Sequence, residues 1–137
     1  MYADALMNEH PWNLWLKDGH AQPWTAGIEG LLEKVMAQFP KHPGALHLYL
    51  HAVEASRTAH RGIPAADRLL DMLPAAGHLV HMPAHIYIRT GHYQKGVAAT
   101  EKARVADSTY IIQCQSEGTY PLLYYPHNTH FWLPVPF

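Results

Sequence analysis

An interval of 34 residues organises the middle of the sequence. It separates Pro40 from Pro74, and Ser108 follows Pro74 at the same distance. Between these positions, apolar residues recur at helical spacing, and proline or glycine divides one run from the next. A hairpin of two helices cannot bury its own apolar face, so repeated hairpins have to stack on one another. The sequence therefore predicts an all-α solenoid of about three 34-residue units.

Start and stop signals place the predicted helices. The first covers residues 26–39, with Thr25 as its N-terminal cap and Pro40 directly after it. Pro43 opens the second helix in its first turn, where a proline is tolerated. Three further helices are predicted over residues 63–73, 78–90 and 92–107. Ser108 ends the last of them.

Length and charge bound the class of protein. The 137 residues suffice for one domain, in which residues 28–108 carry the clear repeats and prolines make residues 109–137 irregular, with the last four residues extended. The 11 acidic and 10 basic side chains nearly cancel and form no basic run, which argues against a nucleic-acid or membrane partner. No basic segment followed by an apolar run opens the chain. We therefore expect a cytoplasmic protein, or a secreted or periplasmic one if the chain is a fragment of a longer protein.

Histidine is the compositional outlier, with 12 residues in the chain. His47 and His51 lie one helical turn apart, and His81 and His85 repeat that pair 34 residues later. Equivalent positions in stacked repeats are neighbours, so these imidazoles are predicted to form two facing ladders on one surface. The residues predicted to complete the site are His127 and His130, with Glu54 and His78 as outer candidates.

The available donors select the metals that such a site can hold. Cys114 is the single cysteine, which excludes an internal disulfide and a thiolate cluster, and we expect it to be buried and inert. Imidazoles with one carboxylate suit copper, zinc, nickel or iron, whereas calcium and magnesium prefer oxygen ligands. Copper is our first choice, because the site is poor in carboxylate, and zinc or iron is second. For Glu54, a solvated carboxylate or an ion pair with Arg57 is as strong an interpretation as ligation or general-base catalysis.

Two resemblances accompany the repeat. The stretch "AHIYIRTGHYQKGVAATEKARVADS", residues 84–108, resembles the tetratricopeptide-repeat consensus, with Tyr87, Gly91, Tyr93 and Ala103 at its aromatic, glycine and small positions. The blocks "ALMNEHPWNLW", "HPGALHLYLHAVEAS", "HLVHMPAHIYIRTG" and "YYPHNTHF" resemble a group of uncharacterised bacterial tetratricopeptide-repeat proteins that carry them in this order. The resemblance implies a right-handed stack in which the histidine positions face a concave, ligand-binding groove.

Two classes of function stay open at this point. The first is a copper- or iron-dependent oxidoreductase acting on a small molecule, with zinc-dependent hydrolysis, in which Glu54 acts as the base, as its variant. The second is a non-catalytic scaffold that binds a peptide in the groove or assembles end to end into an oligomer or filament. The histidine ladders favour the first class, because a scaffold has no need of them. Separately, Trp12, Trp15 and Trp24 are predicted to close the N-terminal hairpin as a hydrophobic cluster.

Overall fold

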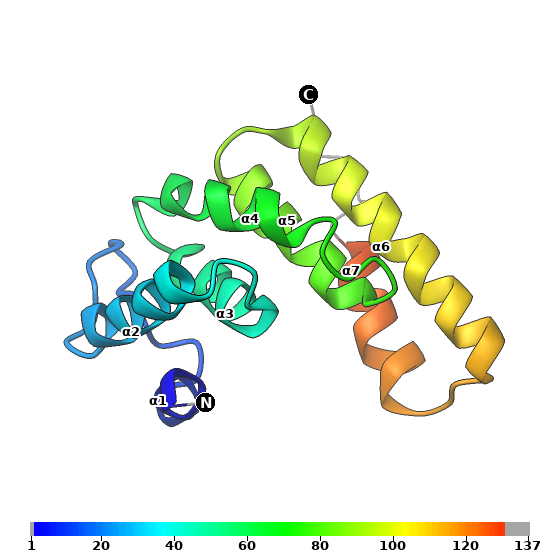
Figure 1. Cartoon of the computed structure of the whole chain (residues 1–137), viewed down its shortest axis with the longest axis horizontal. Helices are drawn as coiled ribbons and strands as arrows, with labels where there is room; N and C mark the ends of the chain where they lie inside the picture. Colours follow the sequence, from blue (N-terminus) through cyan, green and yellow to red (C-terminus); the bar gives the residue numbers. More distant parts are fainter. Residues whose placement is uncertain (1, 131–137) are drawn as a thin grey trace.

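The computed structural model describes residues 2–130, and its helices are arranged as Figure 1 shows. Within this range every regular element is helical, apart from one isolated β-bridge between Trp15 and Ala21. The elements are α1 (Tyr2–Glu9), α2 (Thr25–Gln38), α3 (Pro43–Val53), η1 (Ala59–Gly62), α4 (Ile63–Leu69), α5 (Gly77–Arg89), α6 (Tyr93–Cys114), η2 (Tyr120–Tyr124) and α7 (Tyr125–His130). The predicted all-α class is confirmed. Among these helices we find none with the length and apolarity that a membrane span requires.

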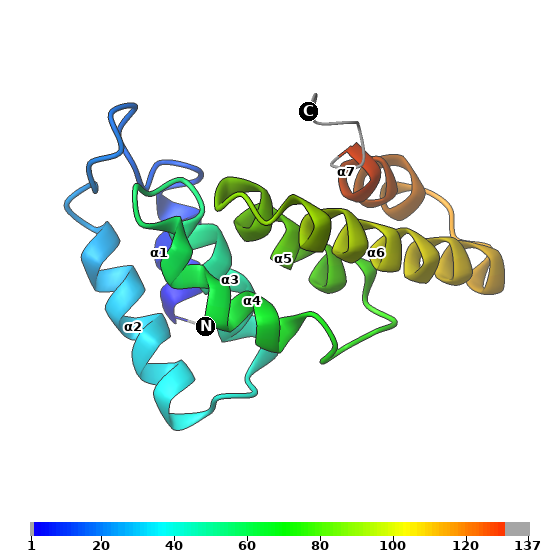
Figure 2. The ribbon, with the colours of Figure 1, turned by 90° about the horizontal axis from the view of Figure 1, so that it is seen from above.

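Consecutive helices contact one another along the chain, from α1 on α2 to α6 on α7, and α3 also reaches α5. Figure 2 shows α6 running along α5, with α7 beside both. Apolar residues at helical spacing form the core: Ile28, Leu32, Leu46, Leu50 and Ile86 are fully buried, whereas Phe39, next to Pro40, is exposed. This core holds α3 and α5 side by side, and these two helices carry five of the twelve histidines.

Helix α3 begins with a side-chain cap, and helix α2 does not. Pro43 is in the first turn of α3, as predicted, and the Nδ1 atom of His42 accepts the backbone N–H of Ala45 at 3.1 Å, so His42 caps the helix. The prediction that Thr25 caps α2 is wrong. Thr25 lies inside the first turn, and its hydroxyl donates to the Leu14 carbonyl, which fixes the preceding loop to the helix.

Helix α6 is longer than its predicted span. It continues through Ser108 to Cys114, so the prediction that Ser108 ends a helix is wrong. No proline or glycine stands between Gly96 and Gly118 to stop it, and the helix ends only where Gln115 adopts a left-handed conformation, with φ of 46°. Cys114, predicted to be buried, is exposed because it occupies this projecting last turn.

The C-terminal part is more regular than predicted. Pro121 stands in the first turn of η2, where the missing proline N–H has no intrahelical partner to lose, and α7 continues directly from η2. The predicted extended stretch, residues 134–137, lies outside the described residues. Helix α7 therefore returns onto α5 and α6 and brings His127 against the histidines of α5.

The N-terminal tryptophans do not form one cluster. Trp15 is partly buried and donates its indole N–H to the Ala52 carbonyl at 2.7 Å, and Trp24 stacks on His10 with ring centroids 3.8 Å apart. Trp12 is 87% exposed and has a φ of 58°, so the clustering prediction is wrong for this residue. A bulky residue in the left-handed region is strained, and such strain concentrates at functional positions.

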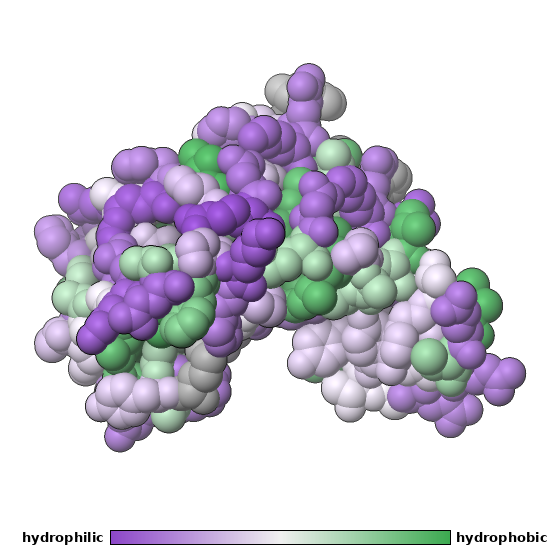
Figure 3. All heavy atoms as spheres, in the orientation of Figure 1, coloured by the Kyte–Doolittle hydropathy of each residue, from purple (hydrophilic) through white to green (hydrophobic). Residues whose placement is uncertain are grey.

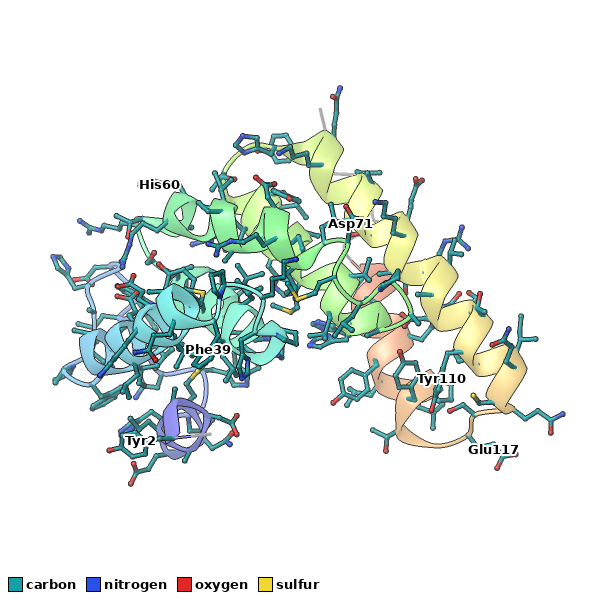
Figure 4. The ribbon with its side chains drawn as sticks, in the orientation of Figure 1. Tyr2, Phe39, His60, Asp71, Tyr110 and Glu117 are labelled. Atoms are coloured by element: carbon teal, nitrogen blue, oxygen red, sulfur yellow. The ribbon has the colours of Figure 1, made fainter. Side chains whose placement is uncertain are left out.

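One buried carboxylate fastens the C-terminal elements to α5. Asp107, on α6, accepts the Tyr120 hydroxyl at 2.7 Å and the side-chain N–H of Asn128 at 2.8 Å. It also sits so close to the Gly77 backbone, at the start of α5, that a side chain at that position would overlap it. The ring of Tyr110, which is labelled in Figure 4, packs on that of Tyr120 with ring centroids 4.7 Å apart. Asp107 therefore ties α5, α6, η2 and α7 together.

We predict that Gly77→Ala lowers the free energy of unfolding by roughly 1–3 kcal/mol, because the new Cβ forces the Asp107 carboxylate out of its position. The matched control is Gly27→Ala, since that glycine lies in α2 with open space around it and alanine has the higher helix propensity. Urea unfolding followed by circular dichroism measures both. Equal stability of the two variants would contradict the assigned contact.

Candidate metal centre

Six histidines converge where α3, α5 and α7 meet. His47 and His51 project from α3 at a spacing of one turn, and α5 contributes three further imidazoles on the face that packs against α3. The last comes from α7, which lies against α5. The α5 and α7 members are His78, His81, His85 and His127.

These six side chains form two groups of three. In the first, made of His47, His51 and His78, one ring nitrogen of each residue lies within 4.8 Å of the others. The second group meets the same limit. Its members are His81, His85 and His127. The groups adjoin, since the ring centroids of His51 and His85 are 5.8 Å apart.

Two nitrogen pairs already have the separation that one metal ion requires. The Nε2 atoms of His47 and His78 are 3.2 Å apart, and those of His81 and His85 are 3.0 Å apart. Nitrogens that bind one ion at 2.0–2.1 Å with tetrahedral angles are separated by about 3.3 Å. Two neutral imidazoles can also share a hydrogen bond at this distance, one as donor and one as acceptor. Each pair could therefore hold an ion between its two Nε2 atoms once the donor ring moves its proton from Nε2 to Nδ1.

Glu54 connects the two groups. One carboxylate oxygen lies 2.9 Å from Nδ1 of His51, and the other lies 2.6 Å from Nδ1 of His85. Burial alone would raise the pKa of Glu54, but the hydrogen bonds from His51 and His85 outweigh it and lower this pKa to about 2. The carboxylate is thus ionised and accepts a hydrogen bond from the Nδ1–H of each ring, which leaves the lone pair of each ring on Nε2. In metal sites, a carboxylate that accepts the second ring N–H of a metal-binding histidine orients that histidine in the same way.

The remaining imidazoles are held in the neutral form by their surroundings. Burial, with the neighbouring histidines adding to it, lowers the pKa of His47 to about 3 and that of His81 to about 2. Burial also lowers the pKa of His78 to about 4. His81 is fully buried. Neutral imidazole is the form that binds a metal ion, because protonation consumes the lone pair.

The structure places the predicted site residues as follows. His78, an outer candidate, belongs to the first group, whereas His130 is exposed at the end of α7 and belongs to neither group. His51 contacts its repeat equivalent His85, but His47 pairs with His78. The expected ion pair between Glu54 and Arg57 is absent, since Glu54 bonds to the histidines and Arg57 donates to the Asp18 carbonyl.

Sequence reasoning missed two residues that support the site. Asp107 and Asn128 hold α7, and thereby His127, against α5. Asn128 lies between the two histidines of "HNTH" and was visible as a polar residue in a candidate motif. Nothing in the sequence distinguished Asp107 from the other charged residues of α6, because its burial depends on how η2 and α7 fold back.

A cavity of about 680 Å³ opens beside the first histidine group. His47, His51 and Glu54 form part of its wall, and the rest comes from α1, the following loop, Arg89 and Tyr124. Figure 3 shows the outline of the molecule indented between the N-terminal helices and the C-terminal part. A small molecule in this cavity therefore has direct access to the first group.

Comparisons with models of protein families, with curated proteins and with solved structures find no match to this chain. The chemistry of the site must therefore be argued from its own residues.

We predict that the metal-free chain loses stability as the pH falls below about 6.5. The pKa values of His47, His78 and His81 are lower in the folded chain than the ordinary value, so below pH 6.5 the unfolded chain binds protons that the folded chain does not. Each buried imidazole then contributes a loss on the order of 1 kcal/mol per pH unit, until its folded-state pKa is reached. Thermal unfolding between pH 8 and pH 4 measures the effect.

His81→Leu serves as the matched variant. It removes one buried imidazole, so its stability should fall less steeply with decreasing pH than that of the wild-type chain. His60→Leu, at an exposed position on η1, should leave the slope unchanged. If the midpoint temperature of thermal unfolding of the wild-type chain stays constant from pH 7 to pH 4.5, the histidines are not held neutral.

Proposed function

We propose that the chain binds two transition-metal ions, one in each histidine group, and that it is a metal-dependent oxidoreductase with copper as the first choice of metal. The observation that carries the proposal is the convergence of two sets of three imidazole nitrogens, each set within 4.8 Å. One such set on a protein surface can arise by chance. Two adjoining sets in which one carboxylate orients a histidine of each are the arrangement expected for a pair of neighbouring metal ions.

The donor set supports the choice of metal. Imidazole nitrogens bind copper, zinc, nickel and iron, and among divalent ions of this series copper binds such sites most tightly. Glu54 is the one carboxylate at the centre, and both its oxygens are hydrogen-bonded to Nδ1 atoms. The ions would therefore have almost purely imidazole ligands. Copper is for this reason the first choice of metal, and zinc or iron is the second.

Three protein ligands leave a coordination position open on each ion, as in catalytic metal sites. Bound copper would supply oxidative chemistry. Two neighbouring Cu(II) ions, each reduced to Cu(I), would take two electrons from one organic substrate as it loses two protons, and dioxygen would restore both ions as it takes up the electrons and protons to form hydrogen peroxide. The zinc alternative would need Glu54 as a general base. Its two oxygens are already engaged with His51 and His85, which supports an orienting role for Glu54 over a basic one.

The order of helix contacts supports a tetratricopeptide-like stack as the framework of this centre. Each helix from α2 to α6 contacts the next, and α3 lies against α5, which is how successive hairpins bring their first helices together. The non-catalytic alternative, a groove that binds a peptide or a stack that assembles into a filament, stays a prediction. Exposed apolar side chains at the end of α6 and on η2, such as Ile112 and Leu122, are the surface that would serve such assembly.

We predict that protein produced without a histidine tag binds two copper or zinc ions per chain. His47→Ala and His127→Ala should each reduce this number to about one, because each removes a ligand from one group only. Glu54→Gln should keep both ions but bind them roughly 10–100-fold more weakly, because the imidazoles lose the acceptor that orients them. Elemental analysis and competition with a chelating dye give the number and the affinity.

The controls are His60→Ala and Glu101→Gln, which change exposed residues outside the centre. Figure 4 shows His60 at the outer edge of the molecule on η1. Circular dichroism on every variant separates loss of ligands from loss of folding. If folded His47→Ala and His127→Ala bind as many ions as the wild-type chain, or if the wild-type chain binds none, the proposal is wrong.

A further inference from the structure

The cavity beside the first histidine group combines an aromatic wall with one accessible cation. Trp12, Trp15 and Tyr124 line it, so planar apolar surfaces surround the space. Arg89 lies at its edge, where its Nε donates to the Glu54 backbone carbonyl at 2.9 Å. This hydrogen bond fixes the guanidinium next to the residue that orients the metal-binding histidines.

Trp12 is the least expected member of this wall. Its side chain is 87% exposed, and its backbone is in the left-handed region, so neither burial nor local conformation accounts for a tryptophan here. Its ring nevertheless meets that of His51 edge to face, with centroids 5.6 Å apart. A large aromatic side chain held over a metal-ligand candidate and otherwise open to solvent is available to contact a bound molecule.

Charge selects an anionic partner for this space. Two divalent cations with one carboxylate, Glu54, leave the centre positively charged, and Arg89 adds to this charge. An anion therefore gains Coulomb energy at the Arg89 end of the cavity. Asp4 also lines the cavity, from α1.

We propose that the cavity binds a small aromatic carboxylate, with its carboxylate on Arg89 and its ring against Trp12 and Trp15. The assignment rests on the proposed function for the charge of the centre, and it names the class of substrate that the centre would act on. The ligand would lie next to His51, which lines the cavity together with Trp12. Arg89 and Trp12 thereby determine specificity without binding the metal.

The test uses the zinc-loaded chain, because zinc undergoes no redox chemistry, and benzoate as the probe. Calorimetry should show that benzoate binds, and that benzyl alcohol, which lacks the charge, and acetate, which lacks the ring, bind at least tenfold more weakly. Arg89→Gln should weaken benzoate binding roughly tenfold or more. Trp12→Ala should weaken it roughly threefold to tenfold, because one aromatic contact is lost.

Matched controls are present in the chain. Arg68 is an exposed arginine whose Nε donates to the Pro64 carbonyl at 2.9 Å, so it copies the bonding of Arg89 outside the cavity, and Arg68→Gln should bind benzoate like the wild-type chain. Tyr93→Ala removes an exposed aromatic residue of α6 and should be equally neutral. Because Arg89 and Trp12 are both exposed, their variants are expected to fold, and circular dichroism checks this.

Zinc content, measured on the same samples, separates the two proposals. If the chain holds two zinc ions but does not bind benzoate, the ligand assignment is wrong and the metal centre stands. The same follows if the Arg89→Gln variant binds benzoate as tightly as the wild-type chain does. A chain that holds no zinc and still binds benzoate through Arg89 overturns the proposed function and retains the cavity as a binding site.

Discussion

The carboxylate of Glu54 is the contact around which this site is arranged. It stands directly after α3, bonds to His51 on that helix and to His85 on α5, and its backbone carbonyl accepts Arg89 from the end of α5. The side chain is only 19% exposed, so its charge is supported by these hydrogen bonds and little by water. The same residue therefore joins two helices, fixes the tautomers of two imidazoles and links both histidine groups.

A stack of helices does not need such a centre for its stability. Ordinary apolar residues at His78, His81 and His85 would bury the same area without the cost of desolvating imidazole, and the lowered pKa values of His78 and His81 record that cost. The apolar core formed by residues such as Leu46, Leu50 and Ile86 lies on the neighbouring faces of the same helices. Polar clusters that a fold retains against this cost are typical of binding and catalytic sites.

Local patterns predicted the helical framework well. Apolar spacing and Pro43 placed α2 and α3, and the repeat interval indicated that His47, His51, His81 and His85 would converge. At the C-terminal end the prediction failed because long-range contacts decided the structure. Asp107 is buried only because η2 and α7 fold back over it, and the register of α7, which brings in His127 and leaves His130 outside, depends on that return. Helix α6 passed Ser108 because no residue there breaks a helix, although the interval suggested a boundary.

The central claim, two metal ions held side by side by six imidazoles, is tested most directly by crystals of the copper-loaded chain measured at the copper absorption edge. We expect two anomalous peaks, each about 2 Å from imidazole nitrogens. One should lie in the group of His47, His51 and His78, and the other in the group of His81, His85 and His127. Peaks found only at exposed histidines such as His20 or His60, with neither group occupied, would contradict it.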